Sequence, residues 1–462
     1  MSGNGHGSGE ETHQDPIDTI RSSPADYVKV AITDVDGVLR GKYLDKGKFL
    51  SAARSGFGFC NVVFGWDTAD ECYDNATYTG WQSGYPDAEV RLDLSTHRRI
   101  PWEGDRHFFL GDFMGTGNQP LEVCPRRALR GVVERAAAMG YVANFGLEFE
   151  WFNFLESPHS VNEKGFRDLT PLTPGMFGYS VLRQAHNQPF FDALLRELRA
   201  FGVPLEGLHT ETGPGVFEAA ILYAPALEAA DRAQLFKAGV KEIGHRFGIM
   251  PTFMARWNTD LPGCSGHAHQ SLWDLDGERN LFHDERDEHS MSGLFRSYVA
   301  GILQLLPELL ALWAPTVNSY KRLVDGFWAP TKPSWGVDNR TVACRVIPGS
   351  ASSTRLEMRV PGADVNPYLA VAACLGAGLW GIEQGLELDQ PPTRGSAYAD
   401  GTLPRLPRTL QEATDRLAGS KVARELFGDG FVEHYVATRE WEWRRFAEAV
   451  TDWELRRYFE II

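Results

Sequence analysis

One segment of this 462-residue chain places carboxylates on a strand that is otherwise apolar. Glu148 and Glu150 stand two residues apart, alternating with Leu147, Phe149 and Trp151. Successive side chains of a strand point to opposite faces, so both carboxylates share one face and the apolar side chains share the other. Two like charges side by side repel each other, and a cation between them removes that repulsion. The segment therefore predicts a half-buried strand whose polar face binds a cation.

Three later segments carry charged or metal-binding side chains in comparable patterns. Glu211 precedes Glu218 across a Gly-Pro-Gly turn, and His267 precedes His269 by two residues. The fourth segment places three charged side chains on one strand face: Arg355, Glu357 and Arg359. A single pair of this kind is typical of a solvated strand face, whereas four such strands in one chain favour a shared site.

The residue types in these strands indicate which ligands such a site would bind. Glutamates with one or two histidines suit Mg²⁺ or Mn²⁺ better than Zn²⁺ or copper, because the chain offers no paired cysteine ligands. Arginines beside the cluster suit phosphate oxygens, which the guanidinium group binds in a bidentate manner. The residues alone predict a metal-dependent enzyme that uses a phosphorylated substrate.

The texture of the chain changes near residue 124. Short alternating segments and turns precede it, and a helix–Gly–strand pattern follows three times, with strand regions expected at 142–152, 205–221 and 249–256. Long helices are expected at 293–313 and 366–383, and the stretch 410–459 is mainly helical in pattern. We expect three parts: a disordered tail at 1–24, a small β-rich domain at 25–122 and a large α+β domain at 123–462.

Composition limits the partners and the compartment. The chain has 46 Lys+Arg and 61 Asp+Glu, a formal net charge of −15, which argues against nucleic acid or an anionic membrane surface as a partner. The longest uncharged run, 365–382, is too short and too rich in Ala and Gly for a membrane span. Six scattered cysteines favour free thiols in a reducing compartment. We therefore expect a cytoplasmic protein.

Six ordered segments resemble the motifs of the glutamine synthetase family, in particular its type I members, and the resemblance extends from about residue 26 to the C-terminus. The segments are 146–150 (GLEFE), 211–218 (ETGPGVFE), 265–273 (SGHAHQSLW), 318–324 (NSYKRLV), 339–345 (NRTVACR) and 355–369 (RLEMRVP followed by NPYL). The resemblance implies an α+β fold, with a β-grasp-like N-terminal domain and a catalytic domain built on a curved antiparallel sheet flanked by helices. It also implies a homo-oligomer, a dodecamer of two stacked rings with active sites between neighbouring subunits.

The resemblance also implies a role for individual residues, with two or more metal ions and ATP in each site. One metal ion would be held by Glu150, Glu211 and Glu218, and a second by Glu148, His267 and Glu357. ATP would be contacted by His269, Ser271, Trp273, Arg345 and Arg355, with Trp273 facing adenine. Substrate carboxylates would be bound by Arg322 and Arg359, next to the glutamate-binding loop at Gly263, and Arg340 would stabilise the transferring phosphoryl group.

Two positions depart from the family pattern. Trp328 stands where ammonium-using members carry a glutamate that closes over the site, and Pro262 stands where asparagine is usual before Gly263. An indole can form an apolar wall but cannot accept a proton from ammonium. Asp74 aligns with the aspartate that activates the amine and is the expected base.

We expect an ATP-dependent ligase that joins glutamate, through γ-glutamyl phosphate, to an organic amine such as ethanolamine, a short alkylamine or a polyamine. An ordinary ammonia-dependent glutamine synthetase is one alternative. A catalytically inactive relative with a structural or regulatory role is the other.

Overall fold

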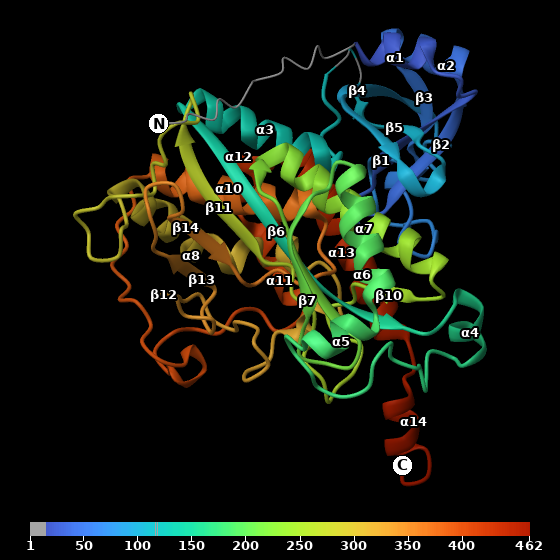
Figure 1. The fold of residues 1–462 in the computed structure, drawn as a ribbon. Helices are drawn as coiled ribbons and strands as arrows, with labels where there is room; N and C mark the ends of the chain where they lie inside the picture. The colour runs from blue at the N-terminus through green and yellow to red at the C-terminus, as the bar shows by residue number, and fades with distance from the viewer. Residues whose placement is uncertain (1–14, 116, 118) are drawn as a thin grey trace, which may run out of the picture.

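Two β-sheets organise the residues that the structure, a computed structural model, describes: 15–115, 117 and 119–462 (Figure 1). A five-stranded sheet belongs to the N-terminal part and a nine-stranded sheet to the remainder. Strand β6 (Tyr141–Phe154), in which buried apolar side chains alternate with less buried ones, crosses the middle of the larger sheet.

The N-terminal sheet has the strand order β2-β1-β5-β4-β3, in which β1 and β5 are parallel and the other neighbours are antiparallel. Its strands are β1 Tyr27–Thr33, β2 Leu39–Asp45, β3 Phe57–Cys60, β4 Asp87–Ile100 and β5 Arg106–Met114. Helices α1 (Pro16–Ser22) and α2 (Lys46–Ser55) pack on it, and short 3₁₀ helices follow at Asn61–Phe64 and Pro101–Glu103. Val30, Phe49 and Phe109 form part of its buried core, so this unit has apolar packing of its own.

Helix α1 corrects the expected tail. Residues 1–14 of that tail lie outside the described residues, but Pro16–Ser22 forms a helix capped by the Asp15 side chain. Ile20 is only 1% exposed and belongs to the same core as Phe49. The polar local composition concealed this helix because the residues that bury Ile20 are distant in sequence.

The larger sheet has the order β12-β13-β14-β11-β6-β8-β7, and β9 and β10 also pair with β6. All neighbours are antiparallel except β12 and β13. The remaining strands are β7 Leu205–Thr210, β8 Val216–Ile221, β9 Ala224–Pro225, β10 Met250–Thr252, β11 Ala268–Asp274, β12 Trp335–Val337, β13 Cys344–Ile347 and β14 Arg355–Met358. The region 205–221, expected as one strand region, is a hairpin of β7 and β8 around the Gly-Pro-Gly turn.

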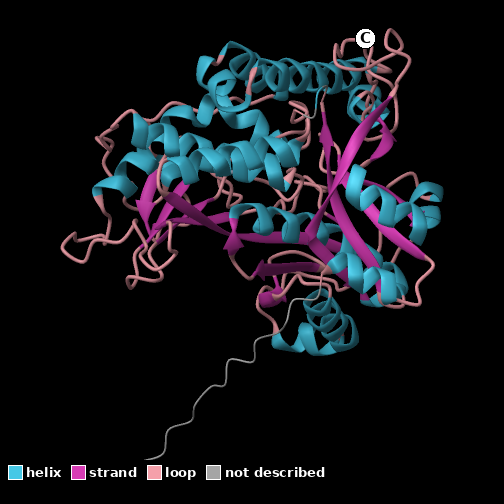
Figure 2. Ribbon diagram, turned by 90° about the horizontal axis from the view of Figure 1, so that it is seen from above, coloured by secondary structure: helices cyan, strands magenta, loops and turns pink. Residues whose placement is uncertain are grey.

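Helices cover the apolar side of this sheet, and Figure 2 shows the long helices gathered along one side of it. The helices that follow the N-terminal sheet in the chain are α3 Pro125–Ala138, α4 Pro158–Glu163, α5 Val181–His186, α6 Gln188–Ala200, α7 Ala226–Arg246, α8 Gly293–Trp313, α9 Ser319–Arg322, α10 Pro367–Glu383, α11 Leu410–Gly419, α12 Lys421–Phe427, α13 Asp429–Glu448 and α14 Asp452–Tyr458, with a 3₁₀ helix at Ala397–Ala399. Phe149 and Trp151 of β6 pack against Phe236 of α7, with ring centroids 6.0 and 5.5 Å apart. Glu148 and Glu150, which alternate with these aromatic residues along β6, therefore project from the opposite face.

Helix α8 is the one helix of the described residues that is long and apolar enough to cross a membrane. It packs against α10 and α11 inside the protein, and Leu306 and Leu310 are fully buried. A Cβ on Gly301 would lie 2.3 Å from the Ala377 carbonyl, so glycine permits the close approach of α8 and α10. The composition of α8 is therefore that of a helix in a protein core. The fold confirms the expected α+β class, a β-grasp-like unit joined to a curved antiparallel sheet flanked by helices.

Candidate active site

Strand register brings the first group of predicted ligands together. On β6, β8 and β7, Glu150 lies opposite Glu218, which lies opposite His209. Cross-strand partners share one face of a sheet, so the three side chains meet on the face away from α7. The His209 Nε2 atom lies 3.1 Å from a carboxylate oxygen of Glu218.

A second row crosses β13, β14 and β11. Arg345 lies opposite Glu357, which lies opposite His269. Glu148, on β6, connects the two rows, because its carboxylate oxygens lie 3.4 Å from His269 Nε2 and 3.4 Å from His267 Nδ1. The curvature of the sheet thus places donors from six strands or strand ends around one space.

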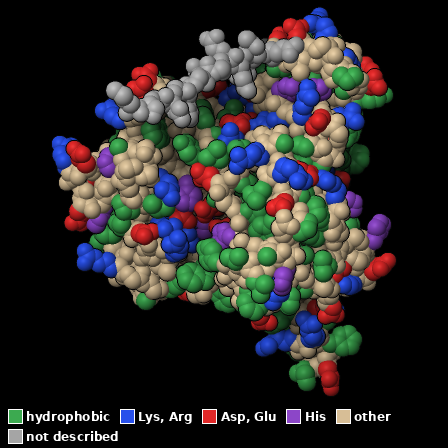
Figure 3. Space-filling model, in the orientation of Figure 1, with side chains coloured by type: hydrophobic (Ala, Val, Ile, Leu, Met, Phe, Trp, Pro, Cys, Tyr) green, Lys and Arg blue, Asp and Glu red, His purple; other side chains and the backbone are tan. Residues whose placement is uncertain are grey.

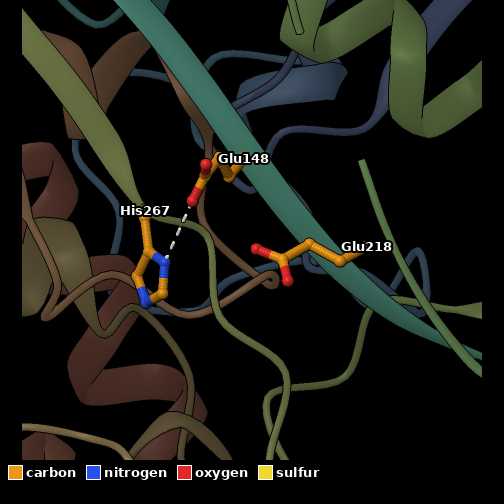
Figure 4. A group of neighbouring side chains, drawn as sticks. All are labelled: Glu148, Glu218 and His267. Carbon is orange, nitrogen blue, oxygen red and sulfur yellow. Dashed lines mark hydrogen bonds and ion pairs between the residues drawn. The ribbon is translucent and has the colours of Figure 1, made fainter. Parts of the chain in front are cut away.

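Three overlapping groups of side chains could each hold a metal ion, because the ligand atoms within each group lie within 4.8 Å of one another. These groups are Glu148, Glu218 and His267; Glu148, His269 and Glu357; and His209, Glu211 and Glu218. Figure 4 shows Glu148, Glu218 and His267 turned toward the same space. The His267 Nε2 atom is buried and has no hydrogen-bond partner among the described residues. Carboxylate oxygens with imidazole nitrogens and an unpartnered donor atom are a ligand set that fits a divalent cation.

The protonation of the two β6 carboxylates differs. Burial, together with the nearby Glu218 charge, raises the pKa of Glu150 to about 7. Burial acts the same way on Glu148, but hydrogen bonds from His267 and His269 hold its pKa well below the usual range. Ionisation of Glu150 is therefore costly, whereas Glu148 stays ionised. A bound cation would favour the ionised form of both carboxylates.

Glu357 is fully buried, at 1% side-chain exposure, and is the acid of the site with arginine partners. Arg345 donates to its Oε2 over 2.8 Å, and Arg359 forms an ion pair with its Oε1. Burial opposes ionisation of Glu357, but His267 and Arg359 lower its pKa to about 2. Two arginines are in this way held at the edge of the acidic cluster.

Two cavities meet at Glu148, which lines both. In Figure 3 the acidic side chains of this region lie in a hollow with Lys, Arg and His around them. The first cavity, of about 340 Å³, is lined by four of the five predicted ATP-contacting residues: His269, Ser271, Trp273 and Arg355. The second, of about 510 Å³, contains all six predicted metal ligands and also Gly263, Trp328, Arg340, Arg345 and Arg359.

Two predicted residues lie elsewhere. Asp74 is exposed and pairs with Arg444 of α13, outside both cavities. Arg322 is 2% exposed and lies behind the cavity wall, where it donates to Val360 O over 2.8 Å and to Ser265 Oγ over 2.9 Å. Within one chain the geometry joins neither side chain to the site, and their roles stay predictions.

Among the residues of the larger cavity that were missing from the predicted site are His209, Tyr179 and Phe327. The Tyr179 ring stacks on His209 with centroids 4.5 Å apart. His209 precedes Glu211 by two residues, the same spacing as His267 and His269, so an available signal pointed to it. Tyr179 and Phe327 lie in loops, where no periodicity marks them.

The fold and the acidic, histidine-containing site are those of a candidate metal-dependent enzyme. Comparison with known proteins then gives the family. A family model for the glutamine synthetase catalytic domain matches residues 122–458. The chain belongs to the glutamine synthetase family, whose members are ligases that use ATP and divalent metals, bind glutamate and are oligomeric.

Individual relatives carry different names. The chain is 54% identical, over 96% of its length and 86% of the relative, to type-1 glutamine synthetase 2 of Dictyostelium discoideum. It is 38% identical, over 96% of its length and 97% of the relative, to a glutamate–isopropylamine ligase of a Pseudomonas species. A solved GmaS/ADP complex superposes with a TM-score of 0.84 at 27% identity, over 96% of this chain and 99% of that one.

Proposed function

We propose that this protein is an ATP-dependent ligase that forms a γ-glutamyl amide from glutamate and an organic amine, such as ethanolamine, a short alkylamine or a polyamine. The observation that carries the proposal is Trp328, whose side chain is 56% exposed and lines the 510 Å³ cavity beside Phe327 and Pro262. These three residues offer an apolar wall to the carbon atoms of an amine. The named relative that uses isopropylamine supports this substrate class.

The proposed reaction has two steps. A γ-carboxylate oxygen of glutamate attacks the γ-phosphorus of ATP, and the bond from that phosphorus to ADP breaks. The amine nitrogen then attacks the acyl carbon of γ-glutamyl phosphate, inorganic phosphate leaves, and the nitrogen gives a proton to a base. Because Glu148 lines both cavities, a nucleotide in the smaller one and glutamate in the larger one would meet beside it.

In this proposal the six acidic and histidine ligands hold two or more Mg²⁺ or Mn²⁺ ions. We assign Glu150, Glu211 and Glu218 to one ion, and Glu148, His267 and Glu357 to another. Bound divalent ions would supply neutralisation of the phosphate charge. His269 fixes Glu148 from the nucleotide side, and Arg355 donates to His269 Nδ1 over 3.2 Å, so these side chains orient one another.

The arginines divide between positioning and charge stabilisation. The exposed Arg340 guanidinium makes no ion pair or hydrogen bond with another described residue, which leaves it available for the transferring phosphoryl group. Arg359 is anchored by Glu357 at the cavity wall and is assigned to a glutamate carboxylate with Arg322, next to Gly263. Arg345 reaches the same wall and is assigned to ATP with His269, Ser271, Trp273 and Arg355.

Asp74 stays our candidate for the base that takes the amine proton. Since it lies outside both cavities of its own chain, this role requires that a neighbouring subunit contribute it to the site, as a stacked-ring dodecamer would allow. The proposal therefore includes the oligomer, the domain division at residues 25–122 and 123–462, and a cytoplasmic location.

An ammonia-dependent glutamine synthetase is the second candidate, and the name of the 54%-identical relative favours it. The decisive assay measures phosphate release with ATP, glutamate and each of ammonium, ethanolamine, isopropylamine and putrescine. We expect an organic amine to give the highest kcat/KM. A highest value with ammonium would overturn the proposal in favour of the second candidate.

Substitution of the aromatic wall tests whether Trp328 sets the preference. Trp328→Glu introduces a proton acceptor and a negative charge, and should shift the ratio of kcat/KM values toward ammonium by about tenfold or more. Trp328→Phe keeps an apolar ring at the same position and should retain the preference for organic amines. An unchanged ratio in Trp328→Glu would remove Trp328 from the argument.

A further inference from the structure

A third cavity lies on the other side of β6 from the carboxylates, between the N-terminal sheet and α7. It has a volume of about 690 Å³, and none of its lining residues lines the two active-site cavities. Much of its wall is apolar: Val30, Leu39, Ile100, Trp102, Phe201 and Phe253. We call it the α7 cavity. In Figure 3 Lys and Arg side chains gather where the N-terminal unit meets the rest of the molecule.

Two lysines of α7 give this cavity a cationic end. Lys237 and Lys241 stand one helical turn apart, so their side chains leave the same face of α7. Their Nζ atoms lie 5.7 and 5.9 Å from the centre of the Phe253 ring, and both side chains line the cavity. Two ammonium groups thus converge on one aromatic ring.

Lys241 has neither an ion pair nor a hydrogen bond with another described residue, and its side chain reaches solvent in the cavity although many protein atoms surround it. Lys237 is half-buried, and its Nζ donates to the Val365 carbonyl over 2.8 Å. Burial and the neighbouring Lys241 charge lower the pKa of Lys237 to about 7, and burial also lowers the pKa of Lys241. The pair therefore lacks enough counter-charge to make two adjacent ammonium groups favourable.

The acidic residues of the cavity supply only part of that counter-charge. The Asp364 charge raises the pKa of Lys237, but burial and the Lys241 charge outweigh it, and all three carboxylates have other partners. Asp36 pairs with Arg439, Glu242 pairs with Lys29 and accepts from Trp102, and Asp364 accepts from Thr316 and Ser319. None of these carboxylates forms an ion pair with Lys237 or Lys241. The other two lysines are also engaged, Lys29 with Glu103 at 2.6 Å and Lys42 over the Phe59 ring at 4.3 Å.

We propose that the α7 cavity binds an organic anion whose carboxylate or phosphate group lies between Lys237 and Lys241 and whose apolar body packs on Phe253 and the apolar wall. The charge of the anion would neutralise the two lysines, with which no carboxylate of the described residues forms an ion pair. An inorganic anion alone would leave the apolar part of the cavity unfilled, so the ligand needs an apolar body as well as an anionic group. Carboxylates and phosphates share this chemistry, and the experiment separates them.

The α7 cavity is connected to the active site through backbone contacts. The segment 361–366, whose Val365 carbonyl binds Lys237, pairs with residues 264–266: Gly266 N donates to Pro361 O over 2.9 Å, and Ala363 N donates to Cys264 O over 3.0 Å. Ser265 N in turn donates to Glu150 over 2.5 Å. An anion that attracts Lys237 competes with the Val365 carbonyl, so occupancy should change ligase activity; this consequence rests on the proposed function.

The binding experiment does not depend on ligase activity. Phenyl phosphate, benzoate and benzyl alcohol are titrated calorimetrically into the full chain with ADP and Mg²⁺ present, which occupies phosphate-binding positions of the active site. We expect at least one of the two anions to bind once per chain, benzyl alcohol to bind far more weakly, and the better anion to identify the headgroup. Absence of saturable binding by both anions, or equal binding of benzyl alcohol, would overturn the proposal.

Variants assign the site. Lys241→Gln should weaken binding of the anion about tenfold, because a charged hydrogen bond is lost, and Lys241→Arg should restore it. Lys48→Gln, at an exposed lysine of α2 outside the cavity, should bind as the unmodified protein does. Equal affinity in Lys241→Gln would place the anion elsewhere and overturn the proposal. Anion binding that responds to Lys241 without any amide formation would instead contradict the proposed function alone.

Discussion

Two clusters of charged side chains in this protein differ in whether the chain itself provides partners for their carboxylates. The first joins the N-terminal sheet to α3 and α7 through Arg126, whose side chain is 3% exposed. Its guanidinium donates to Asp93 over 2.8 Å, to Asp112 over 2.9 Å and to Asp231 over 2.8 Å. Arg130 adds bonds to Asp93 and Asp112. Each acid of this cluster has an arginine partner from the chain itself.

The second cluster is the candidate active site, where the acidic side chains outnumber the cationic side chains that contact them. Arginine ion pairs reach Glu357, whereas Glu148 and Glu218 have only histidine partners. Glu150 accepts from a backbone N–H group, and Glu211 does the same from Thr212. The carboxylates therefore face one another across a space of ligand size.

The pKa values show what this difference means. Burial opposes ionisation of Asp93, but a Ser95 hydrogen bond and Arg126 hold its pKa well below the usual range. Burial and Glu218 instead raise the pKa of Glu150. A cluster that stabilises the fold satisfies its charges internally, while a cluster that binds ligands leaves charge for the ligand to neutralise.

The largest expected effect comes from breaking the internally satisfied cluster. Arg126→Met leaves three buried or partly buried aspartates without their central partner and should lower the free energy of unfolding by about 3–5 kcal/mol. Arg286→Met is the matched control, because Arg286 is 84% exposed and pairs with Asp284 at the surface; it should lower the free energy of unfolding far less. Urea unfolding of both variants tests this. Equal losses would show that the Arg126 cluster contributes no more than a surface pair.

The sequence predicted the active-site cluster far better than the Arg126 cluster. Carboxylates spaced by two on apolar strands are visible without a structure, and the ordered motifs linked the segments. Asp93, Asp112 and Asp231 lie on two strands and a helix with no motif or common spacing, so only tertiary packing brings them to Arg126.

What the sequence did not predict about the candidate site has the same cause. The position of Asp74 beside Arg444 and of Arg322 behind the cavity wall depends on contacts with segments distant in sequence. His209 was missed although it precedes Glu211 by two residues, and its position directly opposite Glu218 depends on the β7–β8 hairpin. Local pattern thus predicted the faces of strands, and not which loops and helices close around them.

A second prediction concerns how the stability of the protein depends on pH through Glu150. The sign is opposite to that of a carboxylate whose pKa is lowered, such as Asp93. The raised pKa of Glu150 favours its protonated form in the folded state, so this contribution to stability is present below pH 4.5 and is lost as the pH rises to about 7. In metal-free buffer the loss should be about 3 kcal/mol, and Glu150→Gln should remove it. Urea unfolding with a chelator at pH 4.5 and pH 8 measures the difference. The same pH dependence in both proteins would contradict the assignment.

The smallest expected effect is the response of stability to metal, which tests the ligand-binding nature of the second cluster directly. An ion that binds only the folded state stabilises it by about 2.7 kcal/mol at a concentration of 100 Kd, so Mn²⁺ should raise the melting temperature. Glu218→Gln removes a carboxylate that takes part in two of the candidate ligand groups and should reduce this rise. Without metal the same variant should be no less stable than the unmodified protein, because repulsion between Glu218 and Glu150 is relieved. Glu440→Gln, at an exposed position of α13, should leave the rise with Mn²⁺ unchanged.

The Arg126 cluster has no such unpaired carboxylates, so Arg126→Met should lower the melting temperature equally with and without Mn²⁺. If Mn²⁺ and ATP fail to change the melting of the unmodified protein, the acidic cluster does not bind its cation, and the catalytically inactive relative becomes the better description.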